Sequence, residues 1–310
     1  MSVIRVQDVE YVRFAAPDLP RMRSFLIDFG MVEAEQTRDG VLCMRGTGDA
    51  PFIHETVEGD PKFLGLALRA ASIDDLKRLA ESERVALEDA TGTGGGSKIS
   101  LRDPNGYLVE VVAGGSRASL RPHGVRAPWN TMSRRDRPGA TKRVAAGAAN
   151  VVRLGHVVLG VNDTSETWAW WQSRFGLLMS DEVRAPNGDL AAVFIRCDRG
   201  ADPADHHSLN FAAIPGQPPR FHHAAFEVAD LDDLMVGHEH LKHAGYRHDW
   251  GIGRHILGSQ VFDYWKDPWG NRVEHWTDGD LFAADVPPNV TDLQTMMGHQ
   301  WGPAAPSDFV

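Results

Sequence analysis

The chain has 310 residues, and at about 150 residues per domain this length favours two domains. Its composition, 42% hydrophobic and 24% charged, excludes a wholly disordered or fibrous protein. The net charge of −10 argues against nucleic acid or an anionic membrane surface as a partner. No apolar run reaches the roughly 18 to 20 residues of a membrane span.

The sequence also favours a reducing compartment. Cys43 and Cys197 are too few for a disulfide framework. The first ten residues, MSVIRVQDVE, lack the basic region and apolar stretch of a signal peptide. We therefore expect a cytoplasmic protein.

One motif occurs twice, with its neighbours in the same order. Asp103-Pro-Asn-Gly-Tyr-Leu-Val-Glu110 returns as Asp267-Pro-Trp-Gly-Asn-Arg-Val-Glu274. Each copy follows an apolar strand that runs into Asp-Asp-Leu and, earlier, a Phe-Gly pair. This order indicates two homologous units. We expect domains at residues 1–115 and 151–285, a surface connector rich in Gly, Ala, Ser and Arg at residues 116–150, and a tail at residues 286–310.

The second unit allows its elements to be predicted in chain order. A helix capped by Thr164 or Ser165 should end at Phe175, and a second helix should cover residues 231–244 with Gly245 as its cap. A turn is predicted at residues 267–270. Apolar runs predict strands at residues 154–161, 193–196, 209–213, 224–228, 261–265 and 272–276.

Three of these strands carry candidate metal ligands, namely His156, His223 and Glu274. Two imidazoles and one carboxylate form the facial set that leaves coordination positions open in non-haem Fe(II) sites. The first unit has Tyr11, Gly65 and Glu110 at the equivalent positions, which suggests one live site and one scaffold copy. Strand histidines that only fill core space, and a glutamate that serves both turns structurally, remain alternative interpretations.

Three further side chains are candidates for acid–base chemistry: His207, His255 and Tyr264. Exposed loop histidines would look the same in the sequence. His222 precedes His223, and because adjacent side chains on a strand point to opposite faces, we expect only one of them to be a ligand and the other to be structural.

Four stretches carry a resemblance to a known family: residues 154–156, 206–209, 223–228 and 253–274. Through them the chain resembles the two-domain type I extradiol catechol dioxygenases of the vicinal oxygen chelate superfamily. The resemblance implies an α+β fold of two tandem domains, each built of paired βαβββ modules around a barrel-like funnel, with the metal site lost from the first domain.

The resemblance also implies roles for individual residues. His156, His223 and Glu274 would bind Fe(II), with Mn(II) as the alternative. His207 would be the acid–base catalyst, and His255 and Tyr264 would contact the catechol oxygens.

By the same resemblance, the substrates would be a small-molecule catechol and O2, the reaction would serve the degradation of aromatic compounds, and the protein would be a homo-oligomer. Val158 and Leu257 are apolar where the family often carries polar residues. They predict a pocket for an apolar ring substituent, although simple barrel packing explains them equally well.

Two other functions stay open. A glyoxalase-like isomerase, lyase or thiol transferase of the same superfamily would use Zn(II), Ni(II) or Co(II), needs no oxygen, and usually has a fourth protein ligand, which is not evident here. A non-catalytic small-molecule-binding protein would have no need of an intact His156, His223 and Glu274.

Overall fold

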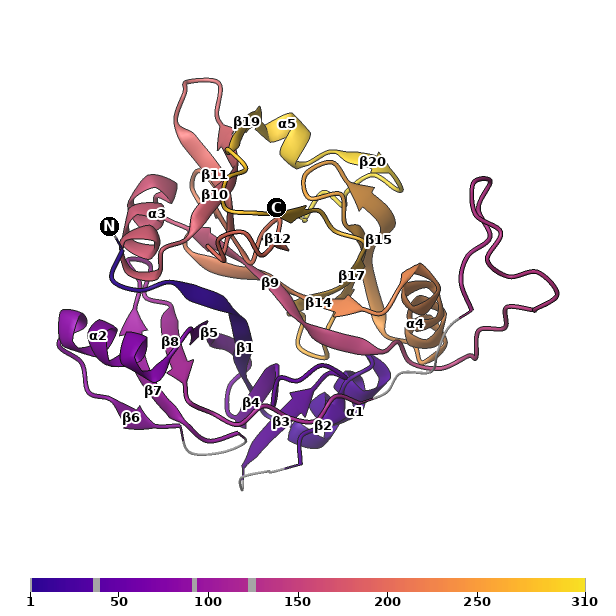
Figure 1. Cartoon of the computed structure of the whole chain (residues 1–310), viewed down its shortest axis with the longest axis horizontal. Coiled ribbons are helices and arrows are strands. Elements are labelled where there is room, and N and C mark those ends of the chain that lie inside the picture. The colour runs from indigo at the N-terminus through magenta and orange to yellow at the C-terminus, as the bar shows by residue number, and fades with distance from the viewer. Residues whose placement is uncertain (1, 36–39, 91–93, 122–126, 310) are drawn as a thin grey trace.

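The structure is a computed structural model that describes residues 2–35, 40–90, 94–121 and 127–309. Those residues form two large mixed sheets, one from each half of the chain, with a small number of helices packed against them (Figure 1). The predicted α+β class is confirmed.

The first half alternates strands and two helices. Its elements are β1 (Val6–Ala16), α1 (Leu19–Asp28), β2 (Val32–Glu33), β3 (Val41–Arg45), β4 (His54–Glu58), β5 (Lys62–Ala70), α2 (Ile73–Glu83), β6 (Glu88–Asp89), β7 (Ser97–Arg102) and β8 (Leu108–Ala113).

The second half repeats this order and adds a tail. Its elements are β9 (Val151–Val161), α3 (Thr164–Phe175), β10 (Leu178–Arg184), β11 (Leu190–Arg196), β12 (Ala204–Asp205), β13 (Leu209–Ala213), β14 (Arg220–Val228), α4 (Leu231–His243), β15 (Arg247–His255), β16 (Val261–Lys266), β17 (Arg272–Thr277), β18 (Leu281–Phe282), β19 (Asn289–Asp292), α5 (Leu293–Met296) and β20 (His299–Trp301).

Both sheets have the same internal symmetry. In the first sheet the strand order is β2-β3-β4-β1-β5-β8-β7-β6, so two βαβββ modules meet where β1 pairs antiparallel with β5. In the second sheet β9 and β14 pair in the same way, between β10-β11-β13 on one side and β17-β16-β15 on the other. Each half therefore contains paired βαβββ modules, as the resemblance implies, and the second sheet curls around an opening (Figure 1).

Local sequence signals explain most of the helix boundaries. α3 begins after Asp163, whose carboxylate accepts from the backbone N–H of Glu166, so the predicted caps Thr164 and Ser165 are wrong by one or two residues. α3 ends at Gly176, which adopts a left-handed conformation with φ of 67°. The turn predicted at residues 267–270 is present, because Asp267 accepts from the backbone N–H groups of Trp269 and Asn271.

Some strands have no counterpart among the predictions. β10 and β15 were not expected, and the sequence of β15, RHDWGIGRH, contains two glycines and no regular apolar alternation. The tail strands were not expected either. β19 pairs with β10 and β20 pairs with β15, so the tail covers both outer edges of the second sheet.

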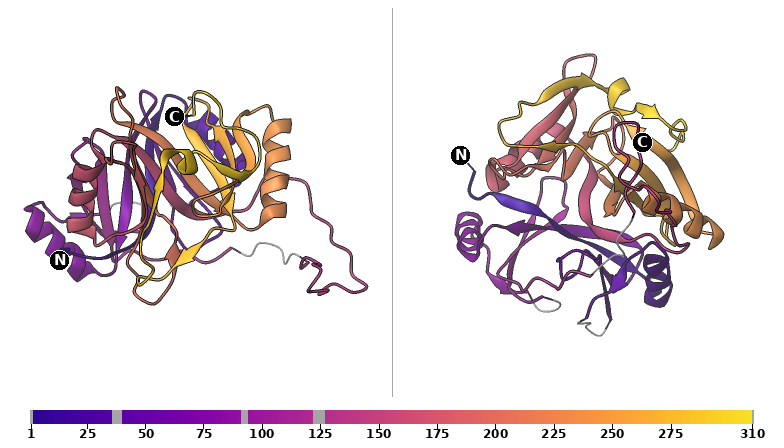
Figure 2. Two further views of the ribbon diagram at one scale, coloured as in Figure 1. Left: turned by 90° about the horizontal axis from the view of Figure 1, so that it is seen from above. Right: turned by 45° about the vertical axis from the view of Figure 1, so that its right-hand side comes forward.

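The connector contacts the first half at its start, where the backbone N–H groups of Ala118 and Arg121 donate to Asp49 and Thr47. In the range 127–148 most side chains are exposed, and this segment extends outward beyond α4 (Figures 1 and 2). The predicted domain boundaries at residues 115, 150 and 285 remain predictions. No helix in the described ranges is long and apolar enough to cross a bilayer.

The two halves share one hydrophobic core, and the first half supports a strand of the second. The ring of Phe29, at the end of α1, stacks on His275 of β17 with centroids 3.8 Å apart. The Phe29 carbonyl accepts from His275 Nε2 at 2.7 Å. Because His275 follows Glu274 in the chain, this contact fixes the strand that presents the candidate carboxylate ligand.

Phe29→Ala should lower the free energy of unfolding by about 3 to 5 kcal/mol, because Phe29 is fully buried and its removal leaves a cavity beside His275. Urea denaturation measures the change. The control Met132→Ala should change stability by less than about 0.5 kcal/mol, since Met132 is 96% exposed. Equal midpoints for the two variants would contradict a shared core.

Candidate metal centre

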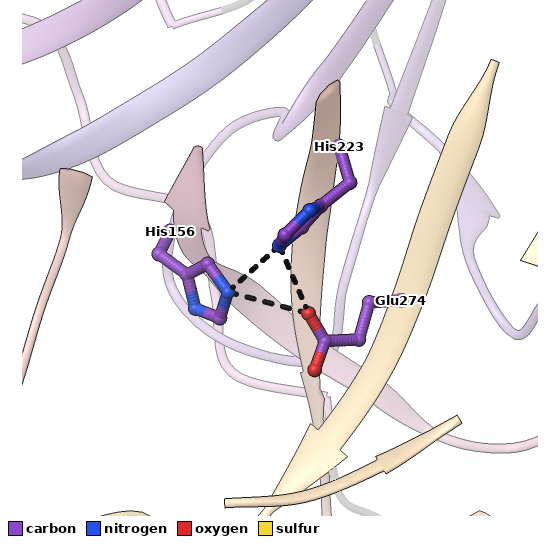
Figure 3. A group of neighbouring side chains, drawn as sticks. All are labelled: His156, His223 and Glu274. Atoms are coloured by element: carbon purple, nitrogen blue, oxygen red, sulfur yellow. Dashed lines mark hydrogen bonds and ion pairs between the residues drawn. The ribbon is translucent and has the colours of Figure 1, made fainter. Parts of the chain in front are cut away.

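Three predicted ligands converge inside the second half. His156 lies on β9, His223 on β14 and Glu274 on β17, and all three side chains point toward one another (Figure 3). His156 Nε2, His223 Nε2 and Glu274 Oε2 form a triangle in which each side measures 3.3 Å. These residues are 2%, 5% and 0% exposed, so solvent does not separate the three groups.

The donor set fits a divalent ion. Among the residues that the structure describes, neither carboxylate oxygen of Glu274 has a hydrogen-bond partner. Burial raises the pKa of Glu274, which is the cost of a carboxylate held there without a cation. Atoms in adjacent octahedral positions at about 2.1 Å from one ion lie about 3 Å apart, close to the observed sides.

The backbone register shows that Glu110 is the first-half counterpart of Glu274. In the first sheet, one alanine on the central strand β5 pairs with Tyr11 on one side and with Glu110 on the other. In the second sheet, one alanine on β14 pairs in the same way with His156 and Glu274. Gly65 replaces the second histidine, and a Cβ at this position would lie 2.3 Å from the carbonyl oxygen of the neighbouring strand. No side chain fits there without a backbone shift.

Glu110 has its own cations. Arg13 Nη1 and Lys98 Nζ donate to Oε1 at 3.1 and 2.5 Å, and the Tyr11 hydroxyl donates to Oε2 at 2.9 Å. The glutamate is therefore retained in the first half as the centre of an ion-pair cluster. These contacts differ from the structural role in the turn that the sequence left open for this glutamate.

In the second half the equivalent cations are missing. Val158 occupies the register of Arg13, and Phe262 occupies the register of Lys98 on the strand beside the glutamate. The same carboxylate position is thus neutralised by side chains in one half and lacks those cations in the other. This contrast favours a metal ion as the partner of Glu274.

A second histidine and carboxylate cluster does not make the same case. Asp263 Oδ1 accepts from His248 Nε2 at 2.8 Å, and its Oδ2 accepts from Trp265 Nε1 at 2.6 Å and His238 Nδ1 at 3.1 Å. These donors lower the pKa of Asp263 against the opposing effect of burial. Its carboxylate is satisfied by protein groups, unlike that of Glu274.

One cavity brings together the other predicted site residues. The predicted acid–base and substrate-contacting residues all line it, together with the two histidine ligands, and its walls are otherwise mainly apolar. The lining includes His156, Val158, Phe194, His207, Asn210, His222, His223, Trp250, His255, Leu257, Tyr264, Met296, Met297 and Phe309.

The polar groups in this cavity are arranged to stay neutral. Burial, reinforced by the neighbouring histidines, lowers the pKa of His207 well below its usual range. Burial lowers the pKa of His255 to about 3. Burial and the nearby Glu274 raise the pKa of Tyr264 well above its usual range. His255 Nε2 and the Tyr264 hydroxyl are hydrogen-bonded at 2.9 Å.

The expectation that His222 and His223 point to opposite faces is wrong. The pairing of β14 with β9 shifts register between Phe221 and His223, which leaves His222 without a direct cross-strand partner. Both rings line the cavity, and their Nδ1 atoms lie 2.7 Å apart. A register shift of this kind depends on strand pairing, so sequence alternation could not have revealed it.

Several lining residues were not among the predicted site residues, although Trp250 was a candidate for an aromatic pocket and the tail through Phe309 a candidate lid. Asn210 is buried on β13, and within the described residues both atoms of its amide lack a hydrogen-bond partner. Trp250 comes from the unexpected strand β15, and Phe309 comes from the tail. Asn210 lies three residues after His207, and that proximity was the one sequence signal available.

Glu274→Gln should reduce bound Mn(II) or Fe(II) to near zero after anaerobic reconstitution, because it removes the only negative charge of the triad. Metal content by mass spectrometry tests this. The matched variant Glu110→Gln should keep the metal but lose a few kcal/mol of stability, since Arg13 and Lys98 lose a buried counter-charge. Equal metal content in the two variants would contradict the assignment.

Comparisons with known proteins agree with this geometry. Residues 153–275 match the Glyoxalase/Bleomycin resistance protein/Dioxygenase superfamily. The chain is 29% identical to metapyrocatechase 2 of Cupriavidus necator, over 98% of this chain and 92% of the relative. A substrate complex of homoprotocatechuate 2,3-dioxygenase from Brevibacterium fuscum has the same fold, with a TM-score of 0.80 at 16% identity over 99% and 92% of the two chains.

Two further relatives differ in the metal that they are named for. A manganese-dependent 2,3-dihydroxybiphenyl 1,2-dioxygenase of Geobacillus genomosp. 3 is 24% identical over 87% of this chain and 85% of its own. An iron-dependent extradiol dioxygenase of Rhodococcus jostii (strain RHA1) is 23% identical over 88% and 90%. With its paired modules and its buried triad, the chain resembles the extradiol dioxygenases of the Glyoxalase/Bleomycin resistance protein/Dioxygenase superfamily, whose model matches residues 153–275.

Proposed function

We propose that the protein is an extradiol dioxygenase, which inserts both atoms of O2 into a catechol beside its hydroxyl groups. The observation that carries this proposal is the position of the triad. His156 and His223, which lie close to Glu274, line a mainly apolar cavity that also presents three side chains able to hold or move a proton. Relatives named as catechol-cleaving enzymes over nearly the whole chain support the same reaction.

His156, His223 and Glu274 would hold Fe(II), with Mn(II) as the alternative. A divalent ion on a facial set of three ligands supplies open coordination positions for both substrates and a route for electrons between them. Relatives named for each metal support both choices. Metal-reconstituted protein distinguishes them by its rate of oxygen consumption.

His207 is suited to transfer a proton during ring cleavage. His206 Nε2 lies 2.7 Å from Asp181 Oδ2, and a His206 ring with its proton on Nε2 presents Nδ1 as an acceptor. His207 Nδ1, at 3.1 Å, then donates to it. This leaves His207 Nε2 with a free lone pair, which can take up a substrate proton and return it later in the reaction.

His255 and Tyr264 would bind the catechol oxygens. A neutral His255 can accept a hydroxyl proton, and the protonated phenol of Tyr264 can donate to an oxygen on which negative charge develops. Their mutual hydrogen bond holds both groups in place before substrate binds.

The cavity favours a catechol with an apolar ring substituent. Val158 and Leu257 both line it, beside the aromatic walls of Phe194, Trp250 and Phe309. The mainly apolar lining would exclude water from the reacting groups, and Arg220 is the charged side chain that also lines the cavity.

Oxygen uptake by anaerobically Fe(II)-reconstituted protein tests the function. The panel should run from bare catechol through alkyl and biphenyl forms to carboxylated catechols, with uptake highest for apolar substituents. A yellow ring-opened product is expected. A matched sample reconstituted with Mn(II) gives the metal preference.

Other outcomes point to the rival functions. Bound metal without oxygen uptake, together with turnover of a glyoxalase-like substrate, would indicate an isomerase, lyase or thiol transferase. Ligand binding without metal or turnover would indicate a binding protein. The homo-oligomer expected from the resemblance stays a prediction, which light scattering can check.

His207→Phe should retain metal but lose at least about a hundredfold in turnover, the usual contribution of a positioned general acid–base. The control His243→Phe alters an exposed histidine on α4, whose Nδ1 lies near a carbonyl of its own helix, and should be unaffected. Steady-state oxygen uptake measures both, and a His207→Phe rate close to that of the control would remove the assigned role.

A further inference from the structure

The residue before the ligand His223 makes a direct contact with it. His222 Nδ1 lies 2.7 Å from His223 Nδ1, on the side of the His223 ring opposite the nitrogen that faces His156 and Glu274. A histidine that binds a metal through Nε2 must carry its proton on Nδ1, and that N–H needs an acceptor. His222 is the group in a position to supply one.

The other nitrogen of His222 determines whether it can act as that acceptor. His222 Nε2 lies 2.6 Å from the carbonyl oxygen of Phe309. A carbonyl oxygen only accepts, so Nε2 carries the hydrogen and the neutral ring presents a lone pair at Nδ1. His223 Nδ1–H then donates to His222, and His223 Nε2 faces the triad as a lone pair.

The position of Arg272 favours the same arrangement. Arg272 Nη1 lies 3.2 Å from His222 Nε2 and donates to the Phe309 carbonyl oxygen at 3.1 Å. If Nε2 accepted from Arg272 instead, its lone pair would face the carbonyl oxygen at 2.6 Å, which is repulsive. Both donors therefore converge on the Phe309 carbonyl.

The tail holds this carbonyl in place. The tail pairs with β10 through β19 and with β15 through β20, at the two edges of the second sheet (Figures 1 and 2). Trp250 Nε1 donates to the Pro303 carbonyl at 2.8 Å. The buried ring of Phe309 packs against Trp250 and Tyr264, with centroids 4.6 and 5.0 Å away.

We propose that the tail sets the proton arrangement of a metal ligand: the Phe309 carbonyl, acting through His222, fixes His223 with its proton on Nδ1 and its lone pair on Nε2. His222 is a positioning residue in this arrangement, and Phe309 positions His222. The inference rests on the metal centre of the proposed function and extends it to residues outside the triad.

Metal affinity is the direct test, because it does not depend on turnover. Mn(II) binding to the full chain is titrated by electron paramagnetic resonance, without catechol. His222→Phe should weaken binding by about 10- to 100-fold, the usual effect of removing a group that orients a metal ligand. His222→Gln offers an amide oxygen to His223 and an amide N–H to Phe309, and should recover most of the affinity. The control is His243→Phe.

The contribution of the tail is tested at Phe309. Phe309→Ala removes the ring that anchors the carbonyl and should weaken Mn(II) binding several-fold, although Phe309 contributes no metal-binding side chain. Phe309→Leu keeps an apolar anchor and should bind more tightly than Phe309→Ala. Thermal midpoints show whether each variant is folded, and if His222→Phe fails to fold, the Gln and Phe309 variants decide the question.

The outcomes separate this inference from the function on which it rests. Wild-type protein that binds neither Mn(II) nor Fe(II) overturns the metal centre and this inference with it. Tight wild-type binding with an unchanged His222→Phe affinity overturns the inference alone. A His222→Gln variant as weak as His222→Phe would also overturn it, and an unchanged Phe309→Ala would exclude the tail.

Discussion

A carboxylate buried without a protein cation is the constraint on which the site depends. Glu110 and Glu274 occupy the same register in the two sheets, yet Arg13 and Lys98 neutralise the first, while Val158 and Phe262 stand at the corresponding positions around the second. An ionised carboxylate in such surroundings is costly unless a cation is present. In one half this glutamate is therefore the centre of an ion-pair cluster, and in the other it lies with two histidines in a group that could hold a metal ion.

The histidines around the cavity are controlled in pairs. His207 and His223 each contact, through Nδ1, a preceding histidine whose other nitrogen meets a fixed oxygen. For His206 the oxygen belongs to Asp181, and for His222 it belongs to a backbone carbonyl. In both pairs the second histidine turns Nε2 away from this contact, and the Nε2 atom of His223 faces the triad. The same local device can therefore prepare one ring for proton transfer and another for metal binding.

The arrangement of the halves supports this chemistry from a distance. Phe29 of the first half stacks on His275 and so fixes the strand of Glu274, while the tail covers both edges of the second sheet. A rigid surround keeps neutral donors and acceptors oriented without solvent, which is what electrostatic stabilisation of a reacting group requires.

The sequence alone was sufficient for the repeat, for the α+β class, and for the three residues that the structure brings together, His156, His223 and Glu274, because a duplicated motif shows which positions the two copies share and where they differ. The sequence did not predict strand β15, because its glycines interrupt the alternation of apolar and polar residues. It also did not predict the side to which His222 points, because a register shift arises only when two strands pair. The part played by Phe309 was also beyond the sequence. Its contact with His222 joins residues 87 positions apart, and the tertiary structure alone brings them together.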